Sequence, residues 1–193
     1  WFMNLSNVTE SPITLTWKGL NSSFSYNPII FNDGVACDAC NNFDFSTGDF
    51  TFTAVGFSNY TAESDAVAPS YTINSSGGST VMTENQWFYA NWSDLSMTYG
   101  NNLDVVLYKW NSTDWVESSA TVANESQTYS NMTYTILQSE EGDSLKFKMQ
   151  AFDGAGNNAS TANFTFTVTD SIPLVTSLSP AHSSFTNNNA SLI

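Results

Sequence analysis

The stretch Ser144-Leu-Lys-Phe-Lys-Met-Gln-Ala-Phe152 indicates most clearly how this chain of 193 residues folds. Every second residue from Leu145 to Ala151 is apolar, and the residues between them are two lysines and a glutamine. Side chains of a β-strand alternate between the two faces of a sheet, so this spacing predicts a strand with one buried and one solvated face. Phe152 falls on the polar side and marks the end of the pattern.

The same two-residue period recurs along the chain, and no stretch of 11 or more residues shows the period of an amphipathic helix. Clusters of glycine, asparagine and aspartate separate the runs and predict turns. We therefore expect an all-β protein. Its other strands are predicted at residues 13–17, 24–31, 50–57, 70–73, 87–92, 104–110, 115–122, 129–137 and 164–169. The turns are predicted at residues 32–34, 76–78, 99–102, 141–143 and 153–158.

Three segments follow from the distribution of these strands. Residues 68–170 hold seven of them, which is the size and spacing of an Ig-like antiparallel β-sandwich. Residues 1–67 hold only four or five, so we expect an incomplete β module whose sheet edges and apolar face stay open. Residues 171–193 hold one or two strands with no module of their own. We interpret this last segment as a donor strand for the N-terminal module of another copy.

Strand donation predicts specific contacts. Main-chain hydrogen bonds would give affinity, and alternate side chains would set the register. The expected groove is bordered by Leu15, Trp17, Ile30, Phe50 and Phe52. Because the contact joins one end of a subunit to the other end of the next, it does not close and builds a fibre. The residues expected to fill the groove at this subunit interface are Leu174, Val175, Leu178, Phe185, Leu192 and Ile193.

The charge balance excludes several classes of partner. Four lysines and no arginine face 18 acidic residues, for a formal net charge of −14. Nucleic-acid binding depends on clustered basic residues, and docking on anionic lipid does too, so neither is expected. No apolar run approaches the roughly 20 residues of a membrane span. The sequence starts at Trp1 without a signal-peptide pattern, so either a leader has been removed or this is an excerpt of a longer chain.

Uncharged polar residues supply the solubility that charge does not. Asn, Ser and Thr number 22, 28 and 22 among the 193 residues. This composition would give roughly six Asn-x-Ser/Thr sequons by chance, and the chain has twice as many. In two strands, Asn131 and Asn163 alternate with apolar residues, so both are predicted to face solvent. N-linked glycans are therefore expected at Asn4, Asn7, Asn21, Asn59, Asn74, Asn91, Asn111, Asn124, Asn131, Asn158, Asn163 and Asn189.

The two cysteines, Cys37 and Cys40, are predicted to form a disulfide that pins a local turn in an oxidising exterior. Two other roles for this pair are a zinc site and a redox-active motif. A zinc site would need two further Cys or His ligands, and the sequence offers only His182. A redox-active CxxC normally opens a helix in a thioredoxin-like unit, which this sequence does not suggest.

Calcium is the one metal that the sequence allows. Asp33, Asp38, Asp44 and Asp49 concentrate in one loop and could offer the oxygen ligands that Ca²⁺ prefers, although no known calcium-loop spacing is present. Solvated turn aspartates are the simpler interpretation. Asp65 and Asp170, in the expected linkers on either side of the sandwich, could likewise be calcium ligands or solvated aspartates. In the glycine-rich turn, Asp153 and Asn157 are interpreted as turn formers.

No catalytic site is expected, and the chain is predicted not to be an enzyme. The single histidine, His182, has no nucleophile or carboxylate beside it and is interpreted as a surface residue. Glu140 and Glu141 adjoin on a predicted hairpin turn, where they would point apart as exposed charges rather than face each other across a glycosidase cleft. The six tryptophans could stack on sugar rings, but Trp87 and Trp92 are predicted to lie on opposite faces of one strand.

Parts of the chain resemble a known group of proteins. The segments that carry the resemblance are 87–94, 105–113, Trp115, 130–133, 147–157, 164–169 and 173–180, and more loosely 33–40 and 50–60. They resemble the Ig-like repeats of archaeal-type extracellular surface proteins, N-glycosylated surface or filament proteins, and the modules that accompany such repeats. The resemblance implies an adhesive, coat or filament role at the cell surface and carries no catalytic residues.

These observations predict a structural subunit of an extracellular glycosylated filament whose partners are identical subunits joined head to tail. No cofactor is expected beyond covalent glycans and the calcium already considered. Two alternatives stay open. The chain could be a repeat segment of a long S-layer or adhesin stalk protein, in which the tail continues into the next repeat, or it could be a carbohydrate-binding β-sandwich module.

Overall fold

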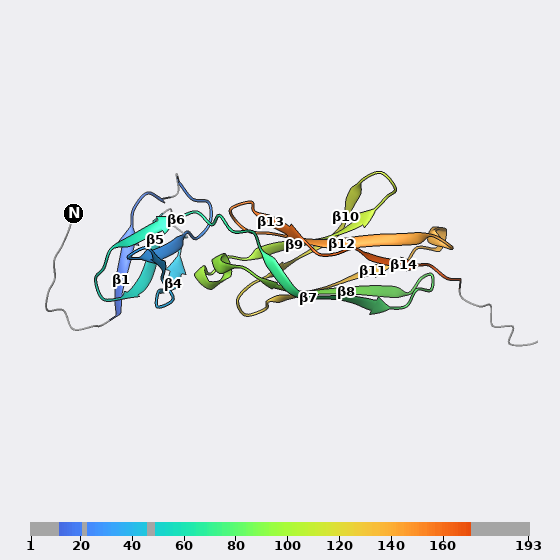
Figure 1. Cartoon of the computed structure of the whole chain (residues 1–193), viewed down its shortest axis with the longest axis horizontal. Coiled ribbons are helices and arrows are strands. Elements are labelled where there is room, and N and C mark those ends of the chain that lie inside the picture. Colours follow the sequence, from blue (N-terminus) through green and yellow to red (C-terminus); the bar gives the residue numbers. More distant parts are fainter. Residues whose placement is uncertain (1–11, 21–22, 46–48, 171–193) are drawn as a thin grey trace, which may run out of the picture.

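The computed structural model describes residues 12–20, 23–45 and 49–170. The protein is all-β, as the alternating patterns predict, and it consists of two β modules placed end to end (Figure 1). The first strand of the described chain lies in one module, and residue 170 lies at the far end of the other. The interface residues expected in 174–193 fall outside the described residues.

The N-terminal module pairs six described strands into two three-stranded sheets. In the first sheet β5 (Phe50–Val55) lies between β1 (Pro12–Trp17) and β4 (Asn41–Asp44); in the second, β2 (Ile29–Asn32) lies between β3 (Val35–Ala36) and β6 (Tyr60–Glu63). The sequence predicted only four or five strands here. The prediction fell short because β3 and β4 are short and flank the cysteine turn, where the sequence has the character of a loop. The strand predicted at 24–31 begins only at Ile29.

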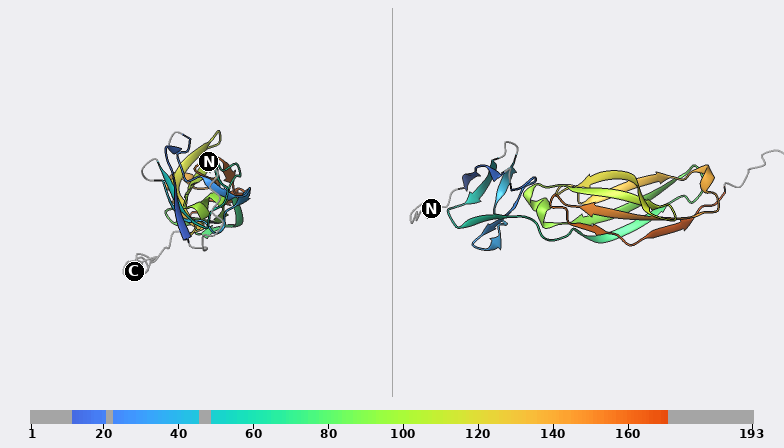
Figure 2. Two further views of the ribbon diagram at one scale, coloured as in Figure 1. Left: turned by 90° about the vertical axis from the view of Figure 1, so that its left-hand side faces the viewer. Right: turned by 90° about the horizontal axis from the view of Figure 1, so that it is seen from above.

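The C-terminal module is a sandwich of two antiparallel sheets (Figure 2). One sheet has the order β11 (Tyr129–Thr135), β8 (Asn85–Ser93), β7 (Ser70–Gly78). The other has the order β10 (Trp115–Ala123), β9 (Leu103–Trp110), β12 (Ser144–Phe152), and both β13 (Asn158–Ser160) and β14 (Phe164–Thr167) pair with β12. Two short 3₁₀ helices, η2 (Leu95–Tyr99) and η3 (Gln138–Glu140), interrupt the strands.

The strand quoted at the outset has the predicted bounds. As β12 it lies inside the larger sheet, and its apolar residues from Leu145 to Ala151 are buried while the intervening ones are half-buried. The core of the sandwich forms around it. Phe147 contacts Phe88 from the opposite sheet at 4.7 Å between ring centroids, and Phe88 is also fully buried. The two-residue period therefore predicted both the strand and its core face correctly.

Strand β8 confirms that its two tryptophans lie on opposite faces. Trp92 is 2% exposed, and its indole N–H donates to the Ser130 hydroxyl at 2.9 Å, which satisfies the one polar group that this large side chain brings into the core. Trp87 is 41% exposed and covers the backbone of Gly77 on the outer surface.

The contact with Trp87 corrects one predicted turn. Residues 76–78 do not form a turn but continue β7 to Gly78. A Cβ added to Gly77 would lie 2.5 Å from the Trp87 ring, closer than atoms can approach. Glycine is thus needed here because an indole lies flat on the strand, and a single sequence does not distinguish that reason from a turn.

Candidate functional site

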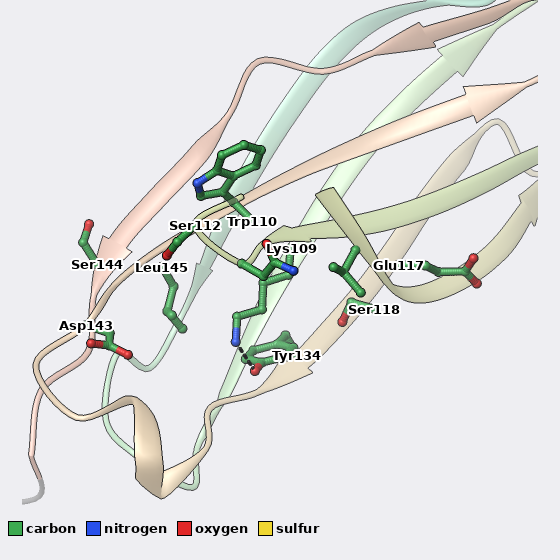
Figure 3. Close-up of a pocket in the computed structure, with 11 residues that line it drawn as sticks. Lys109, Trp110, Ser112, Glu117, Ser118, Tyr134, Asp143, Ser144 and Leu145 are labelled. Carbon is green, nitrogen blue, oxygen red and sulfur yellow. Dashed lines mark hydrogen bonds between the residues drawn. The ribbon is translucent and has the colours of Figure 1, made fainter. Parts of the chain in front are cut away.

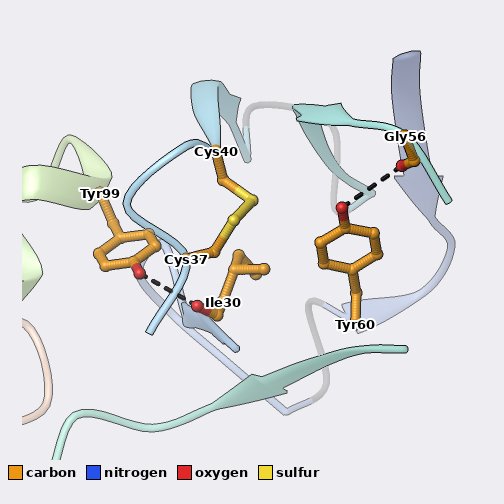
Figure 4. Close-up of a disulfide and its surroundings, with 6 residues drawn as sticks. All are labelled: Ile30, Cys37, Cys40, Gly56, Tyr60 and Tyr99. Carbon is orange, nitrogen blue, oxygen red and sulfur yellow. Dashed lines mark hydrogen bonds between the residues drawn. A yellow bond between two sulfur atoms is a disulfide. The ribbon is translucent and has the colours of Figure 1, made fainter. Parts of the chain in front are cut away.

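The two modules are joined by an inserted tyrosine. Helix η2 of the C-terminal module places Tyr99 in the core of the N-terminal module, where it is 2% exposed (Figure 4). Its hydroxyl donates to the Ile30 carbonyl at 3.0 Å, and its ring lies 4.9 Å from that of Phe43. Burial raises the pKa of Tyr99; the Cys37 backbone acts in the opposite direction, and the charge of Asp38 adds a smaller upward effect, so the phenol stays protonated and can donate.

Reciprocal hydrogen bonds next to Tyr99 fix the angle between the modules. The Asn27 backbone N–H donates to the Asn101 side-chain oxygen at 2.9 Å, and the Asn101 side chain donates back to the Asn27 carbonyl at 2.8 Å. The Asn27 side chain donates to the Tyr99 carbonyl at 2.7 Å. Gly100 ends η2 in the left-handed conformation at φ 78°, which directs Asn101 back toward the first module.

A second loop of the C-terminal module also reaches the junction. Gly154, between β12 and β13, lies against the Tyr26 ring, so that an added Cβ would fall within 2.8 Å of Tyr26. Asn157 in the same loop donates from its side chain to the Asp65 carbonyl at 3.0 Å. Asp65 belongs to the linker between β6 and β7, so this loop holds the linker in place.

An acidic cluster forms where linker and loops meet. Asp65, Asp94 and Asp153 each bring a carboxylate oxygen within 4.8 Å of the other two. Asp65 and Asp153 are 4% and 7% exposed, and Asp94 is half-buried. We call these three residues the junction triad. Among the residues that the structure describes, it is the only such group of histidines, cysteines and carboxylates.

Each residue of the junction triad is anchored by backbone N–H groups. Asp65 accepts from the Val67 N–H at 2.8 Å, Asp94 from the Ser96 N–H at 2.8 Å, and Asp153 from the Asn157 N–H at 2.8 Å. One oxygen of each carboxylate is therefore held by its own turn. The other oxygens of Asp65 and Asp94, both Oδ2, are buried and have no hydrogen-bond partner.

The triad is electrostatically unfavourable as it stands. Burial, and then the charges of Asp94 and Asp153, raise the pKa of Asp65 to about 6, although the Val67 N–H acts in the opposite direction. The Asp94 carboxylate brings an oxygen within 4.8 Å of one of Asp65, so the two negative charges repel each other. A third carboxylate adds to the repulsion, so the cluster favours either bound protons or a bound cation.

The four lysines of the chain interact with other groups. Lys18 pairs with Asp49 at 3.2 Å, and Lys109 pairs with Glu140. Lys146 and Lys148 lie over the Trp115 ring at 5.5 and 5.0 Å from its centroid. No ion pair to the junction triad is found among residues 12–20, 23–45 and 49–170.

These positions test the calcium predictions. The carboxylates of Asp33, Asp38, Asp44 and Asp49 are not brought together; Asp33 accepts from the Ser58 hydroxyl, and Asp49 accepts from the Gly19 N–H at 3.0 Å. Asp170 is exposed and stands outside the triad.

The sequence did not indicate that the carboxylates of Asp94 and Asp153 lie next to that of Asp65. Asp153 and Asn157 form the predicted turn, and Asp153 also belongs to the triad. The contribution of Asp94, which lies 29 residues beyond Asp65, had no signal in the sequence.

The prediction that Glu140 is an exposed charge on a turn is wrong. Glu140 is 5% exposed rather than an exposed turn charge, whereas its neighbour Glu141 is exposed. Its carboxylate accepts from Lys109, from the Tyr134 hydroxyl at 2.6 Å and from the Leu137 N–H at 2.7 Å. Burial acts to raise the pKa of Glu140, but these donors outweigh it and lower the pKa below the usual 4.5.

The Lys109 ammonium is correspondingly held as a cation. Burial acts to lower its pKa, yet hydrogen bonds to Glu140 and Tyr134, the latter at 2.9 Å, raise it overall. A nucleophilic or basic lysine needs a depressed pKa, which is the opposite of the shift found for Lys109. Lys109 and Tyr134 also line a depression together with Trp110, Glu117 and Asp143 (Figure 3).

Aromatic residues line the outer face of the sheet β11–β8–β7. Trp87 and Tyr89 on β8 border a shallow depression together with Asn131 on β11. The Tyr89 ring stacks on Tyr129 at 6.0 Å. Such a row of rings is the feature by which the sequence allowed carbohydrate binding.

The disulfide between Cys37 and Cys40 is present as predicted. Both cysteines are 7% exposed and belong to the core of the N-terminal module, beside Ile30 and Tyr99 (Figure 4). Because the bridge closes a loop of only a few residues, its entropic effect is small. Its contribution is to hold the turn between β3 and β4 against the inserted tyrosine.

The asparagines of the described sequons differ in how far they are exposed. Asn131 and Asn163 are exposed, as the alternation predicts. Asn59, Asn111 and Asn158 are exposed as well, and Asn74, Asn91 and Asn124 are half-buried. Asn4, Asn7, Asn21 and Asn189, like His182, lie outside the described residues.

Comparison with known proteins adds no assignment, because no family model and no curated protein matches the chain. The helices that the described residues form are too short to cross a lipid bilayer.

Proposed function

We propose that this protein is a structural subunit of an extracellular, N-glycosylated filament, joined head to tail by donation of a C-terminal β-strand. The N-terminal module accepts the strand, and residues 171–193 of the neighbouring copy donate it. The Ig-like sandwich between them serves as a rigid spacer.

One observation carries this proposal: the cores of the two modules are covered to different degrees. In the sandwich 17 hydrophobic residues are buried, and only three partly buried ones pack against them. In the N-terminal module eight are buried, one of them the inserted Tyr99, and nine are only partly buried. Within the described residues, this module thus leaves much of its apolar surface half in water, which a further strand would cover.

Strand β1 supports this location for the acceptor. Among the strands that the structure describes it pairs only with β5, which makes it an edge strand of this sheet, and an edge strand is where a further strand can add. Ile13, Leu15 and Trp17 alternate with exposed residues and are each half-buried. Ile30, Phe50 and Phe52, which the sequence placed at the border of the groove, are fully buried in the module itself, so Leu15 and Trp17 remain as its border.

The proposed donor segment starts at the end of the molecule opposite the acceptor module, as a head-to-tail fibre requires. Residue 170, from which the donor segment continues, lies at the pole opposite the acceptor module (Figures 1 and 2). The 23 residues that follow span up to about 75 Å when extended, enough to run along a neighbouring module. Repeating the contact displaces each copy along the long axis and does not close a ring.

Truncation tests the proposal directly. A chain that lacks residues 171–193 is expected to stay monomeric, while the full chain forms filaments visible by electron microscopy. A synthetic peptide of residues 171–193 should bind the truncated chain with 1:1 stoichiometry and raise its melting temperature. Filaments formed by the truncated chain would refute donation by this segment.

Matched variants on β1 locate the acceptor. Leu15→Asp places a charge on the half-buried face and should abolish both peptide binding and filaments. Thr14→Asp places the same charge on the exposed face of the same strand and should leave both unchanged. Equal loss in the two variants would argue against docking on the apolar face of β1.

Glycosylation is proposed at the sequons and has a separate test. Mass mapping of peptides from native material should find hexose-containing adducts first at the exposed Asn59, Asn111, Asn131, Asn158 and Asn163. An intact mass near 21.1 kDa in native material would exclude it.

Carbohydrate binding is a second candidate because the exposed Trp87 and the half-buried Tyr89 line one depression on the outer face of β8. Quenching of tryptophan fluorescence by soluble polysaccharides, lost in Trp87→Ala, would favour it over the filament. A longer stalk protein that contains this chain as a repeat is the remaining alternative, and the intact mass of native material distinguishes it.

A further inference from the structure

We propose that the junction triad binds one divalent cation, Ca²⁺ in preference to Mg²⁺, and that this ion locks the linker to the C-terminal module. The proposal is independent of filament assembly, since it concerns one copy of the chain.

The first argument is the two unpartnered oxygens. Asp65 is 4% exposed, and its buried Oδ2 lacks any hydrogen-bond donor, as does Oδ2 of Asp94. A buried carboxylate oxygen without a donor costs free energy unless a cation or proton satisfies it. The opposite oxygens accept from the Val67 and Ser96 N–H groups, so the free ones are held in place rather than free to rotate away.

The second argument is charge. Three carboxylates meet here, and the lysines of the chain contact Asp49, Glu140 and aromatic rings instead. With four basic residues in the whole sequence, the protein supplies no counter-charge to the triad from its described part. An ion of charge +2 would offset most of the repulsion that raises the pKa of Asp65.

The ligand chemistry selects the ion. All candidate donors are hard carboxylate oxygens, which favour Ca²⁺ and Mg²⁺ over zinc or copper. The donor atoms lie within 4.8 Å of one another, a span that one ion bridges at a Ca–O distance of about 2.4 Å. Mg²⁺ needs a tighter octahedron at about 2.1 Å and gives up its waters reluctantly. Three aspartates on separate loops are better suited to the larger and more adaptable ion.

The consequence concerns the junction. Asp65 lies in the linker, Asp94 caps the helix that inserts Tyr99, and Asp153 lies in the loop that packs on Tyr26. One ion held by all three would fasten the linker to both loops of the sandwich that contact the N-terminal module. Calcium would therefore set how stiffly the two modules are joined.

Calorimetric titration of the full chain with CaCl₂, after EDTA treatment and in 150 mM NaCl, tests the site. We expect one ion per chain with a Kd on the order of 0.1–1 mM, as in other extracellular calcium modules. At 10 mM CaCl₂ the melting temperature should rise by about 4–8 °C, and MgCl₂ should give less than half of that. Exchange of linker amides such as the Val67 N–H should slow in parallel.

Asp65→Asn should weaken Ca²⁺ binding at least tenfold without lowering the melting temperature in EDTA, because it removes repulsion along with the ligand. Asp104→Asn is the matched control, since Asp104 is exposed on β9 and should leave binding unchanged. At position 94 alanine is the better replacement, because asparagine before Leu95 and Ser96 would create a sequon. Two results would overturn the proposal. One is a wild-type chain that shows no heat of Ca²⁺ binding and no rise in melting temperature with Ca²⁺. The other is a loss of Ca²⁺ affinity in Asp104→Asn equal to that in Asp65→Asn.

Discussion

Truncating Tyr99 to alanine is expected to destabilise the N-terminal module by about 3–5 kcal/mol, the usual cost of removing a large buried ring. The ring is 2% exposed and contacts Phe43, and its hydroxyl is hydrogen-bonded to Ile30. The unusual feature is that the residue belongs by sequence to the other module. A substitution in the sandwich should thus unfold its neighbour while the sandwich itself, whose core lies around Phe147, stays folded.

Hydrogen exchange followed by mass spectrometry measures this difference, because it reports each module separately. Peptides from β2 and β5 should lose protection in Tyr99→Ala, and peptides from β9 and β12 should keep it. Tyr99→Phe removes only the hydroxyl and should cost about 1 kcal/mol. Tyr129→Ala, at a position 47% exposed, controls for loss of a tyrosine, and equal loss of protection there would refute the anchoring role of Tyr99.

Replacing Lys109 by methionine is expected to destabilise the sandwich by about 3 kcal/mol, because it leaves a buried carboxylate without its cation. Glu140 is 5% exposed, and its remaining donors would be the Tyr134 hydroxyl and the Leu137 N–H. Chemical denaturation followed by circular dichroism measures the loss. Lys148→Met, on the neighbouring strand β12, removes a half-buried lysine that pairs with no carboxylate in the described residues and should change stability much less.

The same network predicts a pH dependence. The pKa of Glu140 is lowered by folding, so its charged form stabilises the folded state above pH 4.5 and this contribution is lost as the pH falls through the folded pKa. In Glu140→Gln the free energy of unfolding should fall less steeply on acidification. Glu141→Gln alters the adjacent, exposed residue and should follow the wild-type curve; if the two variants behave alike, Glu140 does not carry this effect.

Local patterns predicted most of the sandwich because strands such as β8, β9 and β12 have one clear apolar face. The short β13, with the sequence Asn-Ala-Ser, has none and was not predicted. Residues 144–152 are the best case, where strand, face and burial all agree with the structure. The N-terminal module was predicted less well. Its short strands around Cys37 and Cys40 carry too few alternating residues to be distinguished from a loop, and tertiary pairing alone defines them.

The junction could not be predicted because it depends on contacts distant in sequence. Tyr99 stands in what the sequence presents as a turn, and nothing local indicates that its ring crosses into another module. Asp65 was noticed as a linker residue, but its partners come from 29 and 88 residues further along the chain. Glu140 was interpreted from its neighbour Glu141, whereas its ion-pair partner, Lys109 on β9, lies 31 residues earlier in the sequence.

The placement of the lysines has a consequence for digestive enzymes. Proteases that cut after lysine or arginine find four targets in this sequence. Three of them, Lys109, Lys146 and Lys148, lie within β9 and β12, inside a hydrogen-bonded sheet where the backbone cannot enter a protease cleft. The fourth, Lys18, is 83% exposed directly after β1. Trypsin-like attack would therefore be confined to one bond, and that cut would sever the strand which borders the open edge from the rest of the molecule.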